Sequence, residues 1–145
     1  MPSGVNPQRR EALVLHPIRV KAAVECYHPA NATFAPACMN VTLLVTCPPE
    51  SPVAAKALDF ARALLRQGHA INRLFFFAEG VKNALPSAPL AAQWQTLMTQ
   101  AQLDVTVCSG SAARHGVDAD HTLLPIAGLG DWLMATLASD RLVTF

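Results

Sequence analysis

The chain has 145 residues, the size of one ordinary domain, and 52% of them are apolar, enough to build a substantial core. Its apolar stretches are broken by Arg, Asp or Pro well before the roughly 18 residues that a membrane span needs. The formal net charge is only +1, and the residues after position 38 show no basic stripe of the kind that binds nucleic-acid phosphates. We therefore expect no membrane insertion and no direct nucleic-acid binding.

The first 38 residues show no sustained periodicity and are interrupted by five prolines. Arg9 and Arg10 precede only a short apolar run that His16-Pro17 ends, so a secretory signal is not expected and a cytoplasmic location is. We predict an N-terminal extension over 1–38, either a disordered tail or the product of a mis-assigned start codon, and one domain over 39–145.

Regular pattern begins with a short β-branched apolar run at 41–46, which predicts a buried parallel strand. Ser51 is the expected N-cap of a helix with Pro52 at its first position, and Gly68 is expected just beyond its end. Spacings of three and four residues give this helix one apolar face, formed by Ala54, Ala57, Leu58, Ala61, Leu64 and Leu65.

A second buried strand is expected at 71–77, followed by a turn at Glu79-Gly80 and a long loop. A second helix is indicated by the spacing of Trp94, Leu97, Met98 and Ala101. A third strand is expected at 103–107, with Cys108 at its carboxyl end.

A further helix at 131–138 and a last strand at 142–145 complete the pattern. Strands alternating with helices predict a single-domain, three-layer α/β sandwich with a mainly parallel sheet. In such sheets, ligands and chemistry gather beyond the carboxyl ends of the strands.

Four cysteines, at positions 26, 38, 47 and 108, lack the close pairing of a zinc site. A disulfide framework is not expected in a cytosolic domain of this size, and no role is expected for Cys26 and Cys38. Cys47 follows the first strand, so it could share a sheet edge with Cys108 and resolve an intermediate there as a disulfide. Alternatively, it is a small side chain before a turn.

Cys108 is followed by small residues and then by Arg114. If the chain turns into a short helix through Arg114, free backbone N–H groups point towards the sulfur. Helix N-termini and nearby cations favour the thiolate, and Arg114 would supply a permanent positive charge. The alternative is a buried, inert cysteine that ends a strand.

Three motifs in order and spacing resemble those of the DsrE/TusD sulfurtransferases. They are Phe75 to Ala84 (FFFAEGVKNA), Val107-Cys108 with Ala112 to Gly116 (AARHG), and 126–130 (IAGLG) continuing to 140–145 (DRLVTF). Phe77 and His115 depart from the Tyr and Arg usual in the family, and the segment 117–125 is shorter.

The resemblance implies a flavodoxin-like fold in which Cys108 carries a persulfide and Arg114 supports it electrostatically. It implies a subunit that joins TusB- and TusC-like subunits in a hetero-hexamer, accepts sulfur from a TusA-like carrier and passes it to a TusE-like acceptor. That relay serves 2-thiouridine formation in tRNA. A DsrE-type role in dissimilatory sulfur oxidation, or a non-catalytic assembly subunit, are the alternatives. No metal, nucleotide or organic cofactor is implied.

Other polar residues have structural interpretations beside functional ones. His121 with Asp118 and Asp120 superficially suggests a metal site, but acidic residues in a short loop are usually solvated. Glu79, Lys82 and Asn83 could border the site or form a turn. Gly128-Leu129-Gly130 lacks the third glycine of a dinucleotide motif, so we expect it to begin a helix packed tightly on the sheet. Trp94 and Trp132 are expected in the core or at a subunit interface.

Overall fold

The computed structural model describes residues 38–122 and 124–145. These residues form one sheet of five parallel strands in the order β4-β3-β2-β1-β5. The strands are β1 (Asn40–Val45), β2 (Ala70–Phe76), β3 (Val105–Cys108), β4 (Ile126–Ala127) and β5 (Arg141–Thr144). The helices are α1 (Pro52–Arg66), the 3-10 helix η1 (Ala78–Ala84), α2 (Ala91–Ala101), α3 (Ser109–Arg114) and α4 (Leu129–Leu137).

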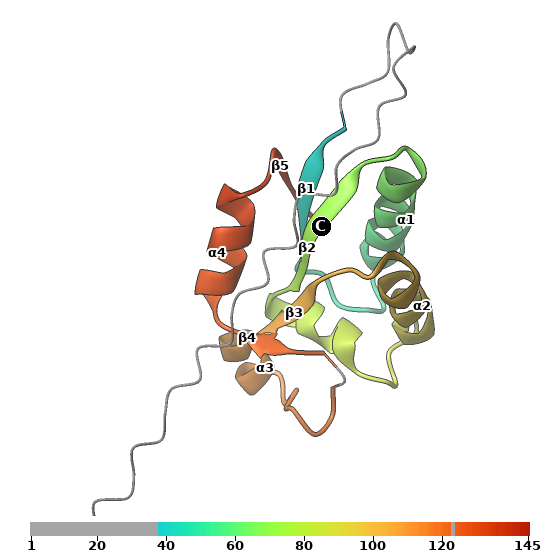
Figure 1. Ribbon diagram of the computed structural model, residues 1–145. Coiled ribbons are helices and arrows are strands. Elements are labelled where there is room, and N and C mark those ends of the chain that lie inside the picture. Colours follow the sequence, from blue (N-terminus) through green and yellow to red (C-terminus); the bar gives the residue numbers. More distant parts are fainter. Residues whose placement is uncertain (1–37, 123) are drawn as a thin grey trace, which may run out of the picture.

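Helices α1 and α2 cover one face of the sheet, and α4 covers the other (Figure 1). Strands β1 to β4 are added in one direction, so right-handed crossovers place α1 and α2 on the same face. The connection from β4 to β5 runs back to the opposite edge, which brings α4 to the other face. The predicted three-layer α/β sandwich with a parallel sheet is confirmed.

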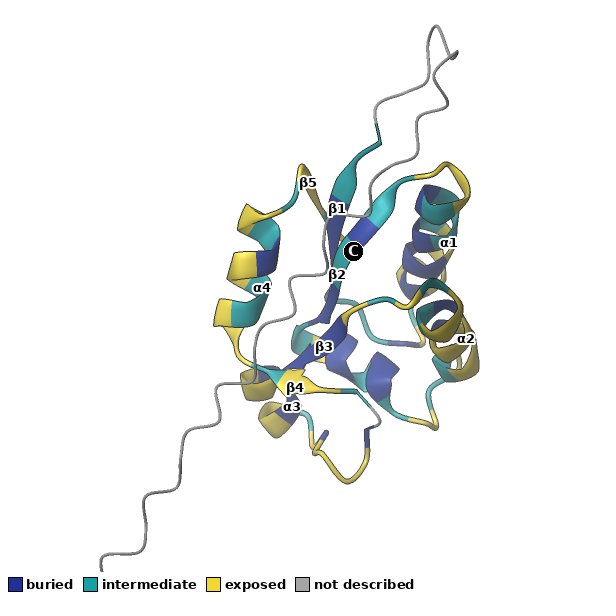
Figure 2. Cartoon of the chain, viewed as in Figure 1, coloured by how far each residue is buried: buried dark blue, intermediate teal, exposed yellow. Residues whose placement is uncertain are grey.

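The core lies between the sheet and the α1–α2 layer, where β1, β2 and β3 bury most of their residues (Figure 2). Phe76 of β2 meets Trp94 of α2 edge to face, with ring centroids 5.6 Å apart. Trp94 is 1% exposed. Trp94 therefore lies in the core, which is one of the two positions predicted for it.

Local capping signals set the bounds of α1 as predicted. The Ser51 side chain accepts a hydrogen bond from the Val53 N–H at 3.2 Å, and Pro52 is the first helical residue. Gly68 has φ +79°, and the N–H of His69 reaches the Leu64 carbonyl at 3.0 Å. These are features of a Schellman ending, which requires a left-handed residue just past the helix.

One expectation about loops was wrong and another is confirmed. The turn and loop predicted after β2 begin instead with η1, a 3-10 helix whose Gly80, Val81, Asn83 and Ala84 are buried. Gly128 is the N-cap residue of α4, which packs on the sheet as expected. The glycines themselves are not needed for that packing, because a Cβ added to Gly128 or Gly130 would meet nothing within 4 Å.

The predicted extension over 1–38 lies outside the described residues except for its last residue, so its character stays a prediction. Within the described part of the chain, no helix is both long and apolar enough to cross a membrane.

Candidate functional site

Cys108 is the last residue of β3 and the N-cap residue of α3. The prediction that it ends a strand and precedes a short helix is confirmed. It is 3% exposed and a free thiol. N-cap side chains usually accept a hydrogen bond from the second or third helical N–H, but within the described residues the Cys108 sulfur accepts none. The thiol therefore has no capping role in the fold.

Cys108 directly precedes the free backbone N–H groups at the start of α3. The first N–H groups of any helix lack intrahelical partners and point towards the N-cap side chain. In α3 these groups belong to Ser109, Gly110 and Ser111, the first residues after Cys108, and none of them donates to the Cys108 sulfur. Free N–H groups at a helix start can stabilise a thiolate or the outer sulfur of a persulfide, and this role stays a prediction for Cys108.

Arg114 lies at the other end of α3, in its last turn, and is exposed. The rise from Cys108 to Arg114 is about 9 Å along the helix axis, and among the described residues Arg114 makes no ion pair or hydrogen bond. At that distance and exposure, solvent screens most of its effect on the sulfur. The structure thus keeps Arg114 near the site but does not place it in a fixed contact.

Helix η1 packs against β2 and β3 and is hydrogen-bonded to the segment that follows β1. The Gly80 N–H donates to the Thr46 carbonyl at 3.0 Å, and the Asn83 amide donates to the Cys47 carbonyl at 3.0 Å. A Cβ on Gly80 would lie 2.1 Å from the Val45 carbonyl oxygen, so only glycine allows this approach. Asn83, predicted to border the site or form a turn, thus has the structural role, and its bordering of the site stays a prediction.

The other two residues of that prediction, Glu79 and Lys82, lie on the outer side of η1. Their side chains form an exposed ion pair with 3.9 Å between Nζ and Oε1. A pair of this kind contributes little to stability and leaves both groups open to solvent.

Cys47 shares the carboxyl edge of the sheet with Cys108, as expected, but β2 lies between them. Val45, Phe76 and Val107 are in register across the three strands. Neighbouring strands are about 4.8 Å apart, so the two thiols belong to strands about 10 Å apart. A disulfide needs Cα atoms within about 7 Å, so the two cannot pair without backbone movement.

The environment of Cys47 does not activate it. Burial raises the pKa of the Cys47 thiol, and a backbone hydrogen bond offsets part of that effect. A raised pKa means a smaller thiolate fraction near neutral pH, and the thiolate is the nucleophile. Cys47 and Cys108 are the free cysteines among the described residues, whereas Cys38 is disulfide-bonded, contrary to expectation.

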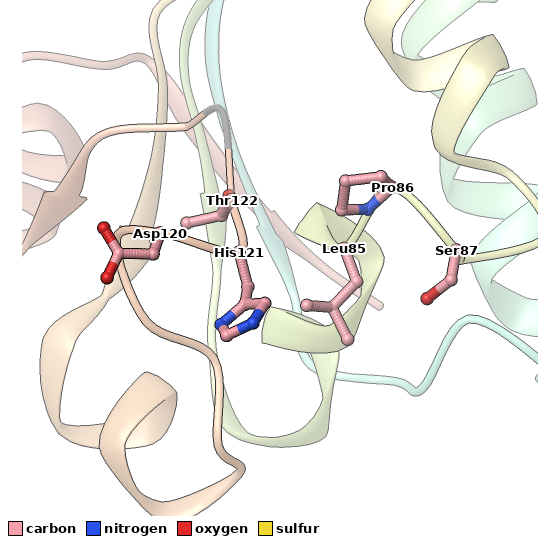
Figure 3. A pocket seen from close by; sticks show the side chains of 6 residues that line it. All are labelled: Leu85, Pro86, Ser87, Asp120, His121 and Thr122. Atoms are coloured by element: carbon pink, nitrogen blue, oxygen red, sulfur yellow. The ribbon is translucent and has the colours of Figure 1, made fainter.

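A cavity of about 290 Å³ lies where the loop after η1 meets the loop after α3. Figure 3 shows His121 and Leu85 on its facing walls; the remaining lining residues are Pro86, Ser87, Asp120 and Thr122. His121 Nδ1 lies 2.5 Å from Asp118 Oδ1, and this hydrogen bond holds the pKa of the Asp118 carboxyl below its usual range. Among the described residues, no group of three His, Cys, Asp or Glu side chains could hold a metal ion.

Fold and site together define a parallel α/β protein with a free thiol at the carboxyl end of an inner strand. The chain belongs to the DsrE/DsrF-like family, whose model matches residues 39–145. Three curated relatives are similar. The TusD homologue of Pseudomonas aeruginosa is 35% identical over 127 residues, covering 74% of this chain and 97% of its own. The sulfurtransferase TusD of Salmonella arizonae is 36% identical, covering 74% and 100%. The DsrE protein of Allochromatium vinosum is 35% identical, covering 68% and 91%.

Solved structures agree on the fold. The ychN protein from E. coli superposes with a TM-score of 0.64 at 21% identity, covering 75% of this chain and all of its own. A protein of unknown function from Methanobacterium thermoautotrophicum reaches 0.61 at 17% identity, covering 73% and 98%.

Proposed function

We propose that the chain is a sulfurtransferase subunit of a sulfur relay, in which Cys108 carries sulfur as a persulfide. The observation that carries this proposal is the free Cys108 thiol, at the carboxyl end of β3 and the start of α3, with no capping role in the fold. The similarity to TusD and DsrE sulfurtransferases supports the reaction class.

The transfer needs only thiol chemistry. The Cys108 thiolate attacks the outer sulfur of a donor persulfide, a new S–S bond forms, and the donor's own sulfur leaves as a thiolate. In the second step an acceptor thiolate attacks the outer sulfur now on Cys108, and the Cys108 thiolate leaves. Each step exchanges one S–S bond for another, so neither an oxidant nor a metal is required.

We propose a TusA-like carrier as the donor, a TusE-like protein as the acceptor, and 2-thiouridine in tRNA as the final product. The similarity to TusD relatives over almost their full length supports this pathway. Similarity of the same level to a DsrE relative supports the alternative, a role in dissimilatory sulfur oxidation. The near-neutral domain fits a protein that hands sulfur to other proteins and does not hold tRNA itself. A cytoplasmic location is part of this proposal.

Helix α4 offers a surface for TusB- and TusC-like partners in a hetero-hexamer. Its outer face is apolar, with Leu129, Leu133, Met134 and Leu137 between 50% and 73% exposed (Figure 2). Contiguous exposed apolar side chains of this kind mark interaction sites in soluble proteins.

Polar contacts, in contrast, hold the inner side of α4 on the sheet. Asp131, the single charged residue of α4, pairs with Arg73 at 3.3 Å and accepts a hydrogen bond from the Thr106 hydroxyl at 3.0 Å. The Asn72 amide donates to the Ala135 carbonyl at 2.8 Å. Because the polar groups of α4 face the sheet, its apolar side chains are left for a partner.

A loading experiment tests the proposal. The protein is incubated with a cysteine desulfurase and a TusA-like carrier, and its mass is measured under non-reducing conditions. We expect an adduct of about 32 Da that is absent in Cys108→Ser and kept in Cys47→Ser. No adduct on the wild type would support a non-catalytic assembly subunit instead, a reading that the burial of Cys108 favours. The genes that neighbour the coding sequence would separate the two pathways.

A further inference from the structure

Helix η1 begins with a residue in an unfavourable backbone conformation. Ala78 has φ +50°, in the left-handed region that residues with a Cβ adopt at a cost. Its N–H donates to the Ser111 hydroxyl oxygen at 3.0 Å. Ser111 belongs to α3 and is 2% exposed. A buried side chain of α3 therefore holds the strained start of η1.

The opposite side of η1 is fixed to the sheet. Gly80 and Asn83 bond to carbonyls at the end of β1, and Gly80 has no room for a side chain there. Between η1 and α3, in contrast, the Ser111–Ala78 bond is the only hydrogen bond among the described residues. The contact between η1 and α3 thus contains one hydrogen bond beside the apolar packing of both helices in the core.

That interaction lies close to the thiol. Ser111 is the third helical residue of α3, and Cys108 is its N-cap residue. Residues in these two positions lie on the same side of a helix start. Helix η1 packs against both β3 and α3, the two elements that meet at Cys108. Helix η1 therefore lies against the junction of β3 and α3, which carries the thiol.

Burial of Cys108 is at odds with transfer between proteins. A thiol that is 3% exposed cannot be reached by the persulfide of a partner protein, because exchange rates depend on access. Some element that covers the sulfur has to move when the partner binds. The contact between η1 and α3 is the candidate, because it combines the strained backbone of Ala78 with a single hydrogen bond.

We propose that Ser111 is a positioning residue for sulfur transfer. By accepting the Ala78 N–H, it holds η1 against α3 and keeps Cys108 buried, and transfer requires this contact to open. The role of this opening in sulfur transfer rests on the proposed function. The opening itself is a property of the chain alone and can be measured without any sulfur donor.

The first test is alkylation of Cys108 by iodoacetamide in the full chain, followed by peptide mass spectrometry. A buried thiol reacts in proportion to the fraction of open molecules. Loss of a hydrogen bond to a buried N–H shifts such an equilibrium about tenfold, so we expect Ser111→Ala to speed Cys108 alkylation about tenfold. Ser109→Ala is the matched control, because Ser109 is exposed on the same helix and its side chain makes no hydrogen bond within the described residues. It should stay within about twofold of the wild type. A wild-type rate in Ser111→Ala would overturn the proposal.

A second variant separates positioning from simple destabilisation. Ala78→Gly keeps the donated N–H and removes the cost of the left-handed conformation, which favours the closed form. The double variant Ser111→Ala with Ala78→Gly should therefore react about threefold more slowly than Ser111→Ala alone. An unchanged rate in the double variant would show that opening does not relax the Ala78 conformation, and would overturn the part of the proposal that rests on it. The melting temperature of each variant is measured in parallel. The alkylation rates are then compared well below the lowest melting temperature, where every variant is folded.

The two proposals fail in different ways. If Ser111→Ala accelerates alkylation but no persulfide ever loads on the wild type, the positioning role stands and the relay function fails. If persulfide loads on Cys108 but Ser111→Ala alkylates like the wild type, the relay function stands and the positioning role fails.

Discussion

Gly80 is the residue at which one added methyl group should have the largest effect. A Cβ at this position would lie 2.1 Å from the Val45 carbonyl oxygen and 2.7 Å from its carbon. Real Cβ atoms do not approach backbone so closely, and neither atom belongs to a side chain that could rotate away. In Gly80→Ala, therefore, η1 must shift away from the end of β1.

The cost can be worked from the contacts that the shift disturbs. Overpacking against a rigid neighbour costs about 1–3 kcal/mol. Weakening the Gly80 N–H bond to the Thr46 carbonyl, 3.0 Å long, adds about 1 kcal/mol. We expect the free energy of unfolding to fall by about 3 kcal/mol. For a domain of this size that corresponds to a melting temperature lower by about 12 °C.

Urea and thermal unfolding, followed by circular dichroism, measure this effect. Gly130→Ala is the matched control, since a Cβ there meets nothing within 4 Å and alanine favours a helix. It should leave the free energy of unfolding unchanged or raise it slightly. If Gly80→Ala unfolds within about 0.5 kcal/mol of the wild type, the close approach of η1 to β1 does not exist in solution.

Three further predictions concern other parts of the chain. Ser51→Ala removes the side-chain acceptor for the Val53 N–H and should lower the free energy of unfolding, measured by urea titration, by about 1 kcal/mol. An unchanged urea midpoint would exclude a capping role for Ser51. Met134→Glu places a charge on the apolar outer face of α4. It should weaken association with partner subunits or with further copies in size-exclusion chromatography, at an unchanged melting temperature. Association equal to that of the wild type would show that α4 is not part of the interface. Burial raises the pKa of the Cys47 thiol, so its thiolate fraction at pH 7 is below that of an ordinary cysteine. The rate of Cys47 alkylation should therefore rise with pH through a midpoint above the usual cysteine pKa. A midpoint at or below that pKa would contradict the burial.

The sequence was sufficient wherever the structure depends on neighbours along the chain. The caps of α1 follow from Ser51, Pro52 and Gly68, because capping involves residues a few positions apart. The buried strands follow from their β-branched and aromatic runs, and the position of Cys108 follows from the change of pattern after Val107. The alternation of strands and helices likewise predicted the parallel sheet and its layers.

The site contains features that depend on distant parts of the chain, and these could not be predicted. The alternation of elements does not say that β5 pairs with β1, and this pairing sends α4 to the far face. Cys47 could be placed at the correct edge, but the strand that separates it from Cys108 is known only from the strand order. Within the described residues, the two-residue β4 was too short to give a periodic signal.

What the sequence alone determined is therefore the set of local elements and a thiol at the end of a strand, because hydrophobic periodicity and capping are short-range effects. Only the tertiary structure decided how that thiol is enclosed. Gly80 signals a turn in the sequence, and its need for close approach is evident only beside Val45. The Ser111–Ala78 bond joins residues 33 positions apart, and no local pattern specifies such a pair. Packing of the sheet edge, η1 and α3 brings these groups together.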